Sequence, residues 1–175
     1  YTDGLLGADI SLKMENGRIW VNEDFETSEP GIYAIGDVVA STQLAHVAMA
    51  QATYVVENIA GQPHSIRLKA VPSGMYVSLP IVPNCIYTEP EIATVGITEQ
   101  KAKELGMQVR CGVYRMDGNG KSIIAREENG FIRLIFETYN NTIVGAQMMC
   151  PRATDMIGEM ATAIANGLTA EQLSL

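Results

Sequence analysis

Short turns follow one another so closely in the second half of the chain that they limit how its strands can pair. Strand-like runs are predicted at 84–87, 92–95, 109–115, 122–126, 131–137 and 142–149. The segments between the last four runs, at 117–120, 128–130 and 139–141, carry Gly, Asn or Asp. Connections this short can join only antiparallel neighbours, because a parallel crossover needs about a dozen or more residues. The sequence therefore predicts an antiparallel sheet.

Capping and stop signals mark three helices in the same half of the chain. The first is expected to be capped by Thr98. The second has apolar residues at helical spacing over 153–164 and is expected to end at Asn166-Gly167. The third begins with a predicted capping box formed by Thr169 and Gln172. Together with the strands, these helices predict an α+β fold in which helices cover an antiparallel sheet.

The first half of the chain carries a strand–turn–helix pattern. A short apolar run over 32–35 is predicted to be a strand, and Gly36-Asp37 ends it. Ser41 and Thr42 are predicted helix caps. Apolar residues then recur at helical spacing over 44–59, which predicts one long helix.

This pattern can hold a polar ligand through two kinds of group. In α/β sheets, ligands bind where strands end, and Gly36 would let a ligand approach the backbone closely. The Asp37 carboxylate can accept hydrogen bonds from the hydroxyls of a sugar or polyol. The unpaired N–H groups near Leu44, Ala45 and His46 suit an anion or an electron-rich oxygen. The spacing fits equally well a turn in which Asp37 only caps the helix.

Residues 27–37, which read Thr-Ser-Glu-Pro-Gly-Ile-Tyr-Ala-Ile-Gly-Asp, resemble the second FAD-binding motif of the pyridine-nucleotide disulfide oxidoreductases. The segment 43–46, Gln-Leu-Ala-His, resembles the one that reaches the flavin ring in dihydrolipoamide dehydrogenases. Glutathione reductases usually carry Thr-Pro in place of Ala45-His46, which favours the dihydrolipoamide branch. The family often has Glu-Gly where this chain has Gln51-Ala52, which leaves the exact subgroup open.

The resemblance implies a set of flavin contacts in this chain. Asp37 would contact the ribityl chain of FAD, and the residues after it would reach the flavin edge, mostly through their backbone. The implied cofactor-binding residues are Gly36, Asp37, Gln43, Leu44, Ala45 and His46.

Residues 82–175 resemble the C-terminal dimerisation domain of the same family, from its opening strands at 82–96 to the start of its last helix at 167–173. The resemblance implies four segments along the chain. These are the exit from a nicotinamide domain at 1–18, the remnant of an α/β FAD-binding domain at 19–65, a linker or insertion at 66–81, and a dimerisation domain at 82–175 that is truncated at its C-terminus. A short strand is also expected at 19–22, after a turn at Asn16-Gly17. The remnant should be poorly stabilised alone, because parallel strands need cover on both faces.

Catalytic groups of the family are missing from the sequence. The chain has three widely spaced cysteines in apolar stretches, which predicts buried, unreactive thiols; they are Cys85, Cys111 and Cys150. Neither a redox cysteine pair nor a Gly-x-Gly-x-x-Gly loop occurs. In the family, the catalytic His and its Glu partner follow the helix that begins near Thr169. We therefore assign no catalytic residue, and we expect the chain alone to be inactive and to bind FAD weakly or not at all.

Composition excludes several other classes of function. A net charge of −8 and a pI near 4.7 argue against binding to nucleic acid, because no basic stripe could meet phosphates. His46 and His64 are the only histidines and the thiols are scattered, so no metal site is expected. The sequence lacks an apolar run of the roughly 18 residues that a membrane span needs, which favours a cytoplasmic protein without membrane contact.

The expected function is that of the C-terminal part of an FAD-dependent dihydrolipoamide dehydrogenase-like enzyme. The resemblance implies electron transfer from a dithiol, through a disulfide and the flavin, to NAD. It also implies a homodimer, with a lipoyl-bearing protein or a small dithiol as the substrate of the parent enzyme. Two alternatives remain open: a fragment of a glutathione- or mercuric-type reductase, and a free-standing, non-enzymatic dimerisation module.

Overall fold

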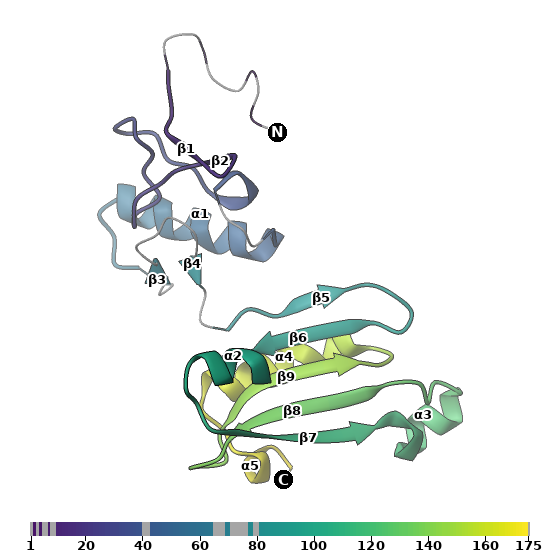
Figure 1. The fold of residues 1–175 in the computed structure, drawn as a ribbon. Coiled ribbons are helices and arrows are strands. Elements are labelled where there is room, and N and C mark those ends of the chain that lie inside the picture. The colour runs from purple at the N-terminus through teal and green to yellow at the C-terminus, as the bar shows by residue number, and fades with distance from the viewer. Residues whose placement is uncertain are drawn as a thin grey trace. The chain divides into compact units, whose positions relative to one another are not determined.

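The chain forms two compact units, over residues 1–80 and 81–175 (Figure 1). The computed structural model describes residues 2, 4, 7, 10–39, 43–64, 69, 70, 77, 78 and 81–174. Most of the predicted insertion at 66–81 lies outside these residues. Within it, β3 (Lys69–Ala70) pairs with β4 (Val77–Ser78) in antiparallel fashion.

The second unit is built on a five-stranded sheet in the order β5-β6-β9-β8-β7. Its strands are β5 (Asn84–Ile86), β6 (Ile92–Gly96), β7 (Val109–Arg115), β8 (Phe131–Glu137) and β9 (Ile143–Met149). Every neighbouring pair is antiparallel. Helix α4 (Ala153–Ala165) lies on one face of the sheet, and α2 (Glu99–Glu104) lies on the other (Figure 1). The predicted α+β fold is therefore confirmed.

The core of this unit lies between α4 and the central strands. Side chains alternate across a strand, so the register brings Ala93 opposite Met148 and Val95 opposite Ala146 on the face toward α4. The helix contributes Ile157 and other buried residues of its apolar stripe to the same cluster. Three of the methionines are core residues, because Met116, Met148 and Met160 belong to this buried cluster.

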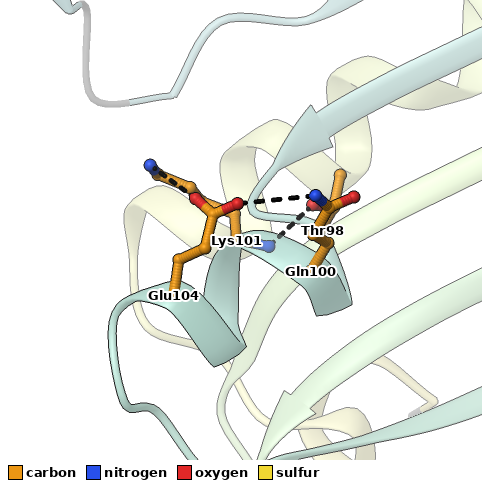
Figure 2. Close-up of polar contacts among 4 residues, drawn as sticks. All are labelled: Thr98, Gln100, Lys101 and Glu104. Carbon is orange, nitrogen blue, oxygen red and sulfur yellow. Dashed lines mark hydrogen bonds and ion pairs between the residues drawn. The ribbon is translucent and has the colours of Figure 1, made fainter.

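Helix α2 begins as its sequence predicts. The Thr98 hydroxyl oxygen accepts a hydrogen bond from the Lys101 N–H at 3.1 Å, which satisfies one of the unpaired donors of the first turn (Figure 2). One turn later, Lys101 Nζ lies 3.0 Å from Glu104 Oε2, and the Gln100 side chain reaches the same carboxylate. These contacts between residues three and four apart lie on the exposed side of the helix and add a few tenths of a kcal/mol each.

The predicted capping box also forms, at the start of α5 (Ala170–Leu173). The Gln172 N–H donates to the Thr169 hydroxyl at 3.3 Å, and the Thr169 N–H donates to Gln172 Oε1 at 2.9 Å. Both bonds satisfy groups that the helix itself leaves unpaired, so the chain enters α5 at a defined residue.

The prediction of a strand over 122–126 is wrong. The segment forms helix α3 (Gly120–Ala125), which Arg126 ends with a positive φ of 58°. Asn119 caps the helix, because its Oδ1 accepts from the Ser122 N–H at 3.0 Å. The next strand in the chain, β8, is already paired with β7 and β9, so no position beside it is open to another strand. The isoleucines that suggested a strand are instead exposed on α3.

The first unit opens with a short hairpin. Strands β1 (Met14–Glu15) and β2 (Arg18–Ile19) are joined by Asn16-Gly17, and both turn residues have positive φ, as tight hairpin turns require. The predicted turn is thus confirmed. The prediction of a strand over 19–22 is only partly correct, since Ile19 is the one residue of that range that lies in β2.

Helix α1 (Ala45–Ile59) is the main element of the first unit. It begins with Leu44 as the N-cap residue, whose own side chain makes no capping hydrogen bond, while the predicted caps, Ser41 and Thr42, lie outside the described residues. Beside it, a small core gathers residues from several segments of the unit. Its buried members are Ile19, Val21, Phe25, Ala34, Val39 and Val55.

The prediction of a strand over 32–35 is also wrong. Within the described residues, the segment makes one isolated antiparallel bridge, between Tyr33 and Glu26. The 3₁₀ helix η1 (Gly36–Val38) then follows directly. A strand needs a neighbour that continues the hydrogen-bond ladder, and beyond this single bridge the described residues supply none.

Glu91 ties the start of β6 to the first turn of α4. Its Oε2 accepts hydrogen bonds from the Thr154 hydroxyl at 2.6 Å and from the Thr154 N–H at 2.9 Å. These two bonds, the hydroxyl bond first, lower the pKa of the Glu91 carboxyl below its ordinary value of 4.5. A carboxylate at a helix N-terminus is also favoured by the helix dipole.

We expect this bond to make the second unit sensitive to acid. A carboxyl whose pKa is lowered by folding stabilises the folded state in full above its unfolded pKa, and the stabilisation is lost as the pH falls through the folded pKa. Glu91→Gln should therefore weaken the chain at pH 7 and reduce the loss of stability below about pH 4.5. Urea unfolding followed by far-UV circular dichroism between pH 3 and 7 measures both effects. The matched control is Glu127→Gln, at an exposed residue, and an unchanged acid response in Glu91→Gln would contradict the prediction.

Candidate functional site

The turn that carries the predicted ligand contacts packs against the middle of α1. The Gly36 N–H donates a hydrogen bond to Gln51 Oε1, with 2.6 Å between nitrogen and oxygen. Gly36 is buried and has a φ of +70°, and a Cβ atom at this position would lie 3.2 Å from Cβ of Ala48. Glycine is therefore suited to this turn for two reasons, the left-handed backbone and the close approach to the helix.

Asp37 follows in the same turn, and its side chain is exposed. Within the part of the chain that the structure describes, no hydrogen bond or ion pair engages its carboxylate. The interpretation in which Asp37 merely caps the helix is wrong, because the N-cap residue of α1 is Leu44 and, among the described residues, no hydrogen bond joins the Asp37 carboxylate to the helix. A carboxylate that only accepts hydrogen bonds is thus left available for a hydroxyl donor.

The other predicted contacts lie at the start of α1. Gln43, Ala45 and His46 are exposed, and Leu44 is half-buried. The first helical bonds run from the N–H groups of residues 47 and 48 to the Leu44 carbonyl, so the N–H groups of Ala45 and His46 precede the ladder. These N–H groups form the positive end of a helix of 15 residues. Residues 40–42, which connect this end to η1, lie outside the described residues.

Sequence reasoning missed one residue of the site, Gln51. In the sequence it stands out only as a departure from the family pattern, yet its side chain is fully buried and binds the Gly36 N–H. Its Nε2 has no hydrogen-bond partner among the described residues. The signal was present in the sequence, because position 51 lies on the same helical stripe as Val47 and Val55. A polar residue on a buried stripe needs a hydrogen-bond partner.

The cysteines do not form a reactive site. Burial is the main cause that raises the pKa of all three thiols, Cys85, Cys111 and Cys150. A raised pKa reduces the thiolate fraction at neutral pH, and the thiolate is the nucleophile. The prediction of buried thiols is confirmed for Cys150, whereas Cys85 and Cys111 are half-buried.

The same described residues hold no group of three or more His, Cys, Asp or Glu side chains that could bind a metal ion. None of the helices among them is long and apolar enough to cross a membrane. A hollow of about 480 Å³ in the second unit is lined by residues 106–108 and 137–139, and none of the predicted contact residues borders it.

Comparison with known families gives two matches along the chain. Residues 82–175 match the model of the pyridine nucleotide-disulphide oxidoreductase dimerisation domain. Residues 1–52 match a second model, which is described as pyridine nucleotide-disulphide oxidoreductase. The second match includes η1 and the first half of α1, where the candidate contacts lie.

Curated relatives align with nearly the whole chain. The dihydrolipoyl dehydrogenase of Geobacillus stearothermophilus is 37% identical over 175 residues, which are 99% of this chain and 35% of that protein. A dihydrolipoyl dehydrogenase of Bacillus subtilis (strain 168) is 40% identical over 161 residues, which are 91% of this chain and 31% of that protein. The chain thus spans about a third of the length of these relatives.

Solved structures share the fold. LpdA from Mycobacterium tuberculosis superposes with a TM-score of 0.77 at 24% identity, covering 96% of this chain and 35% of that one. The HOCl-induced flavoprotein disulfide reductase RclA from Escherichia coli gives a TM-score of 0.75 at 20% identity, covering 89% of this chain and 34% of that one. At these identities the likeness establishes a common fold.

Proposed function

This chain belongs to the pyridine nucleotide-disulphide oxidoreductase family, and we propose that it is the C-terminal part of a dihydrolipoyl dehydrogenase-like flavoenzyme. In this proposal the first unit contributes contacts to FAD, and the second unit joins two copies into a homodimer. The redox disulfide and the remaining cofactor contacts would come from outside these 175 residues. The enzyme would act in the cytoplasm on a lipoyl-bearing protein or a small dithiol, with NAD as the electron acceptor.

One observation carries the flavin-binding part of the proposal: an exposed Asp37 carboxylate that has no partner among the described residues, on a turn that is fixed to α1. The ribityl chain of FAD is a polyol, and its hydroxyls can donate to a carboxylate. The N–H groups of Ala45 and His46, which have no acceptor among the described residues, suit the electron-rich oxygen at the edge of a flavin ring. The groups present in this chain therefore fit the cofactor that the family implies.

Bound FAD would supply the transfer of electrons between a dithiol and NAD. The chain's own residues would bind and orient it. Asp37 would hold a hydroxyl of the polyol, and the positive end of α1 would stabilise negative charge on a nearby oxygen atom. Because these groups are fixed by the backbone, they would need little rearrangement when the charge changes.

A second face of α1 supports the idea that further protein covers this unit in the complete enzyme. Val47, Gln51 and Val55 form its buried stripe. Met49 and Val56, seven residues apart, form a second apolar stripe, with exposed fractions of 70% and 64%. A helix on a protein surface usually has one apolar face, whereas a helix between layers has two. The second stripe thus favours another layer of protein against α1.

The experiment that tests the function uses the complete protein that contains this chain. We expect it to retain FAD through purification and to oxidise dihydrolipoamide with NAD. Light scattering should give the mass of a dimer. Reduction of glutathione disulfide without dihydrolipoamide turnover would instead select the glutathione-type alternative. A protein that binds no FAD and has no turnover would contradict the proposal.

Asp37→Asn in the complete protein should weaken FAD binding. A hydrogen bond to a charged acceptor contributes about 1.5–3 kcal/mol and one to a neutral acceptor about 0.5–1.5 kcal/mol, so the dissociation constant should rise about 5- to 10-fold. Fluorescence titration of the flavin-free protein with FAD measures the change. The asparagine keeps the shape of the side chain and one acceptor oxygen, so the loss reports the charge of the carboxylate.

Glu23→Gln is the matched control. Glu23 is also exposed in the first unit, and the substitution removes the same charge at a position with no proposed role. FAD affinity should stay within about twofold of the unaltered protein, since a screened surface charge contributes little. Equal effects of the two substitutions would mean that net charge, and not a contact from Asp37, governs flavin binding.

A further inference from the structure

Gln51 lies under the candidate site without belonging to the contacts implied for the cofactor. It occupies the buried stripe of α1, and its side chain has an exposed fraction of 0%. A buried amide among apolar neighbours is retained at a cost unless its polar atoms are used. The hydrogen bonds of this amide therefore indicate what the residue does.

The amide oxygen is committed to the turn. Gln51 Oε1 accepts from the Gly36 N–H at 2.6 Å, across 15 positions of sequence. Because an N–H donor must meet an oxygen, this bond fixes which end of the amide faces Gly36. Nε2 is left as the other end, and it has no hydrogen-bond partner among the described residues. The amide oxygen of Gln51 thus binds the turn, and the amide nitrogen takes no part in that bond.

The turn depends on this bond because, among the described residues, it is the one hydrogen bond between η1 and α1. Gly36 is buried, and among the described residues Gln51 Oε1 is the one acceptor recorded for its N–H. Asp37 is next in sequence, is exposed, and has no side-chain partner of its own among those residues. The backbone of the turn therefore sets the direction of the Cα–Cβ bond of Asp37, and Gln51 holds that backbone.

Resting on the flavin-binding role proposed above, we infer that Gln51 is a positioning residue that fixes Asp37 for the polyol hydroxyls of the flavin. It acts through the Gly36 N–H and does not touch the cofactor. The oxygen of the amide is the atom that matters. A side chain of similar length that keeps an acceptor should therefore serve, and one without an acceptor should not.

Three substitutions at position 51 separate these requirements. Gln51→Met keeps the length and volume but has no oxygen acceptor. Gln51→Asn keeps the amide but withdraws its oxygen by one methylene from Gly36. Gln51→Glu keeps an acceptor at the same length and removes the Nε2 donor. In the complete flavoprotein, we expect FAD affinity to fall about 5- to 10-fold for the first two and to stay within about threefold for the third.

Coupling to Asp37 is the decisive measurement, because a merely structural role would not show it. FAD dissociation constants are measured for Gln51→Met, Asp37→Asn and the double variant. If Gln51 acts through Asp37, Gln51→Met should have less than about a twofold further effect once Asp37 is replaced. Urea unfolding of each flavin-free protein monitors folding, and Gln51→Asn replaces Gln51→Met in the cycle if the methionine variant does not fold.

The possible failures can be told apart. An unchanged FAD affinity in Asp37→Asn would overturn the flavin assignment, and with it the role of Gln51. If Asp37→Asn weakens binding but the effect of Gln51→Met persists in full in the double variant, the positioning role alone is overturned. Loss of affinity in Gln51→Glu equal to that in Gln51→Met would also overturn it, because the acceptor oxygen would then not be the group that matters.

Discussion

Gly145→Ala is expected to unfold the second unit. Gly145 lies in β9, between Gly96 of β6 and Ile135 of β8 in the ladder. A Cβ atom at this position would lie 2.0 Å from the carbonyl oxygen of Ile97, far inside contact distance. Because β9 is hydrogen-bonded on both sides, the backbone cannot move away without breaking the sheet.

The expected loss in the free energy of unfolding is on the order of 4–5 kcal/mol or more, which is exceptional for a point mutation. A domain is stable by only about 5–15 kcal/mol, so much of the unit should be unfolded without denaturant. Urea unfolding of the 175-residue chain, followed by far-UV circular dichroism, measures this loss. A cooperative transition within about 1 kcal/mol of the unaltered chain would contradict the close packing of β6 and β9.

Gly158→Ala is the matched control, since it makes the same chemical change in the same unit. Gly158 is exposed on α4, and a Cβ atom there would meet nothing within 4 Å. Alanine is the better helix former, so this variant should be more stable by about 0.5–1 kcal/mol. Opposite signs for the two substitutions would locate the effect in the contact at Gly145 and not in the loss of a glycine.

The contrast between these glycines marks how far the sequence could predict the fold. The bounds of β7 and β8 agree with the predicted runs, because turn residues flank both strands in the sequence. The pairing of Gly145 with Gly96 could not be predicted, since it depends on the register between strands that are distant in the chain.

Local strand propensity also gave wrong predictions where neighbouring segments determine the structure. The run over 122–126 has the composition of a strand but forms a helix, because Asn119 caps it and β8 has no free side. The run over 32–35 has the composition of a buried strand, but within the described residues it makes only one bridge. Strand propensity needs a partner that is hydrogen-bonded along its length, and the sequence does not reveal whether one is available.

In the candidate site, too, one residue could be predicted from the sequence and another could not. Asp37 could be proposed from a local motif, because the turn and the residues around it are continuous in sequence. The role of Gln51 could not be proposed in this way, because it depends on a hydrogen bond to Gly36, which lies 15 residues earlier in the chain. A polar residue on a predicted buried stripe is the signal to seek in such cases, and its partner comes from the structure.

Gly36→Ala should disturb both the first unit and the flavin contacts. The left-handed backbone costs an L-residue about 1–2 kcal/mol. The new Cβ would also lie 3.2 Å from Cβ of Ala48, so the turn or the helix must move by a few tenths of an ångström. That movement strains the hydrogen bond from the Gly36 N–H to Gln51, and losing it would cost about 1–3 kcal/mol more. The expected total is about 2–5 kcal/mol.

Gly31→Ala isolates the backbone part of this effect. Gly31 also has a positive φ, of 80°, but a Cβ atom there would meet nothing within 4 Å. The loss of stability in Gly31→Ala should therefore be limited to about 1–2 kcal/mol. The chain has one tryptophan, Trp20, in the first unit, so its fluorescence during urea unfolding reports the stability of that unit. Equal losses for the two variants would show that the contact with α1 contributes nothing.

Ala48→Gly tests the contact from the other side. Alone, it should destabilise α1 by about 1 kcal/mol, because glycine is a poor helix former. Combined with Gly36→Ala, it removes the methyl group that the new Cβ would meet, so the double variant should lose less than the sum of the two single losses. The same double variant in the complete flavoprotein should regain part of the FAD affinity lost in Gly36→Ala, since Gly36 could again reach Gln51 and hold Asp37 in place. Recovery of stability without recovery of FAD affinity would separate the packing of the turn from flavin binding.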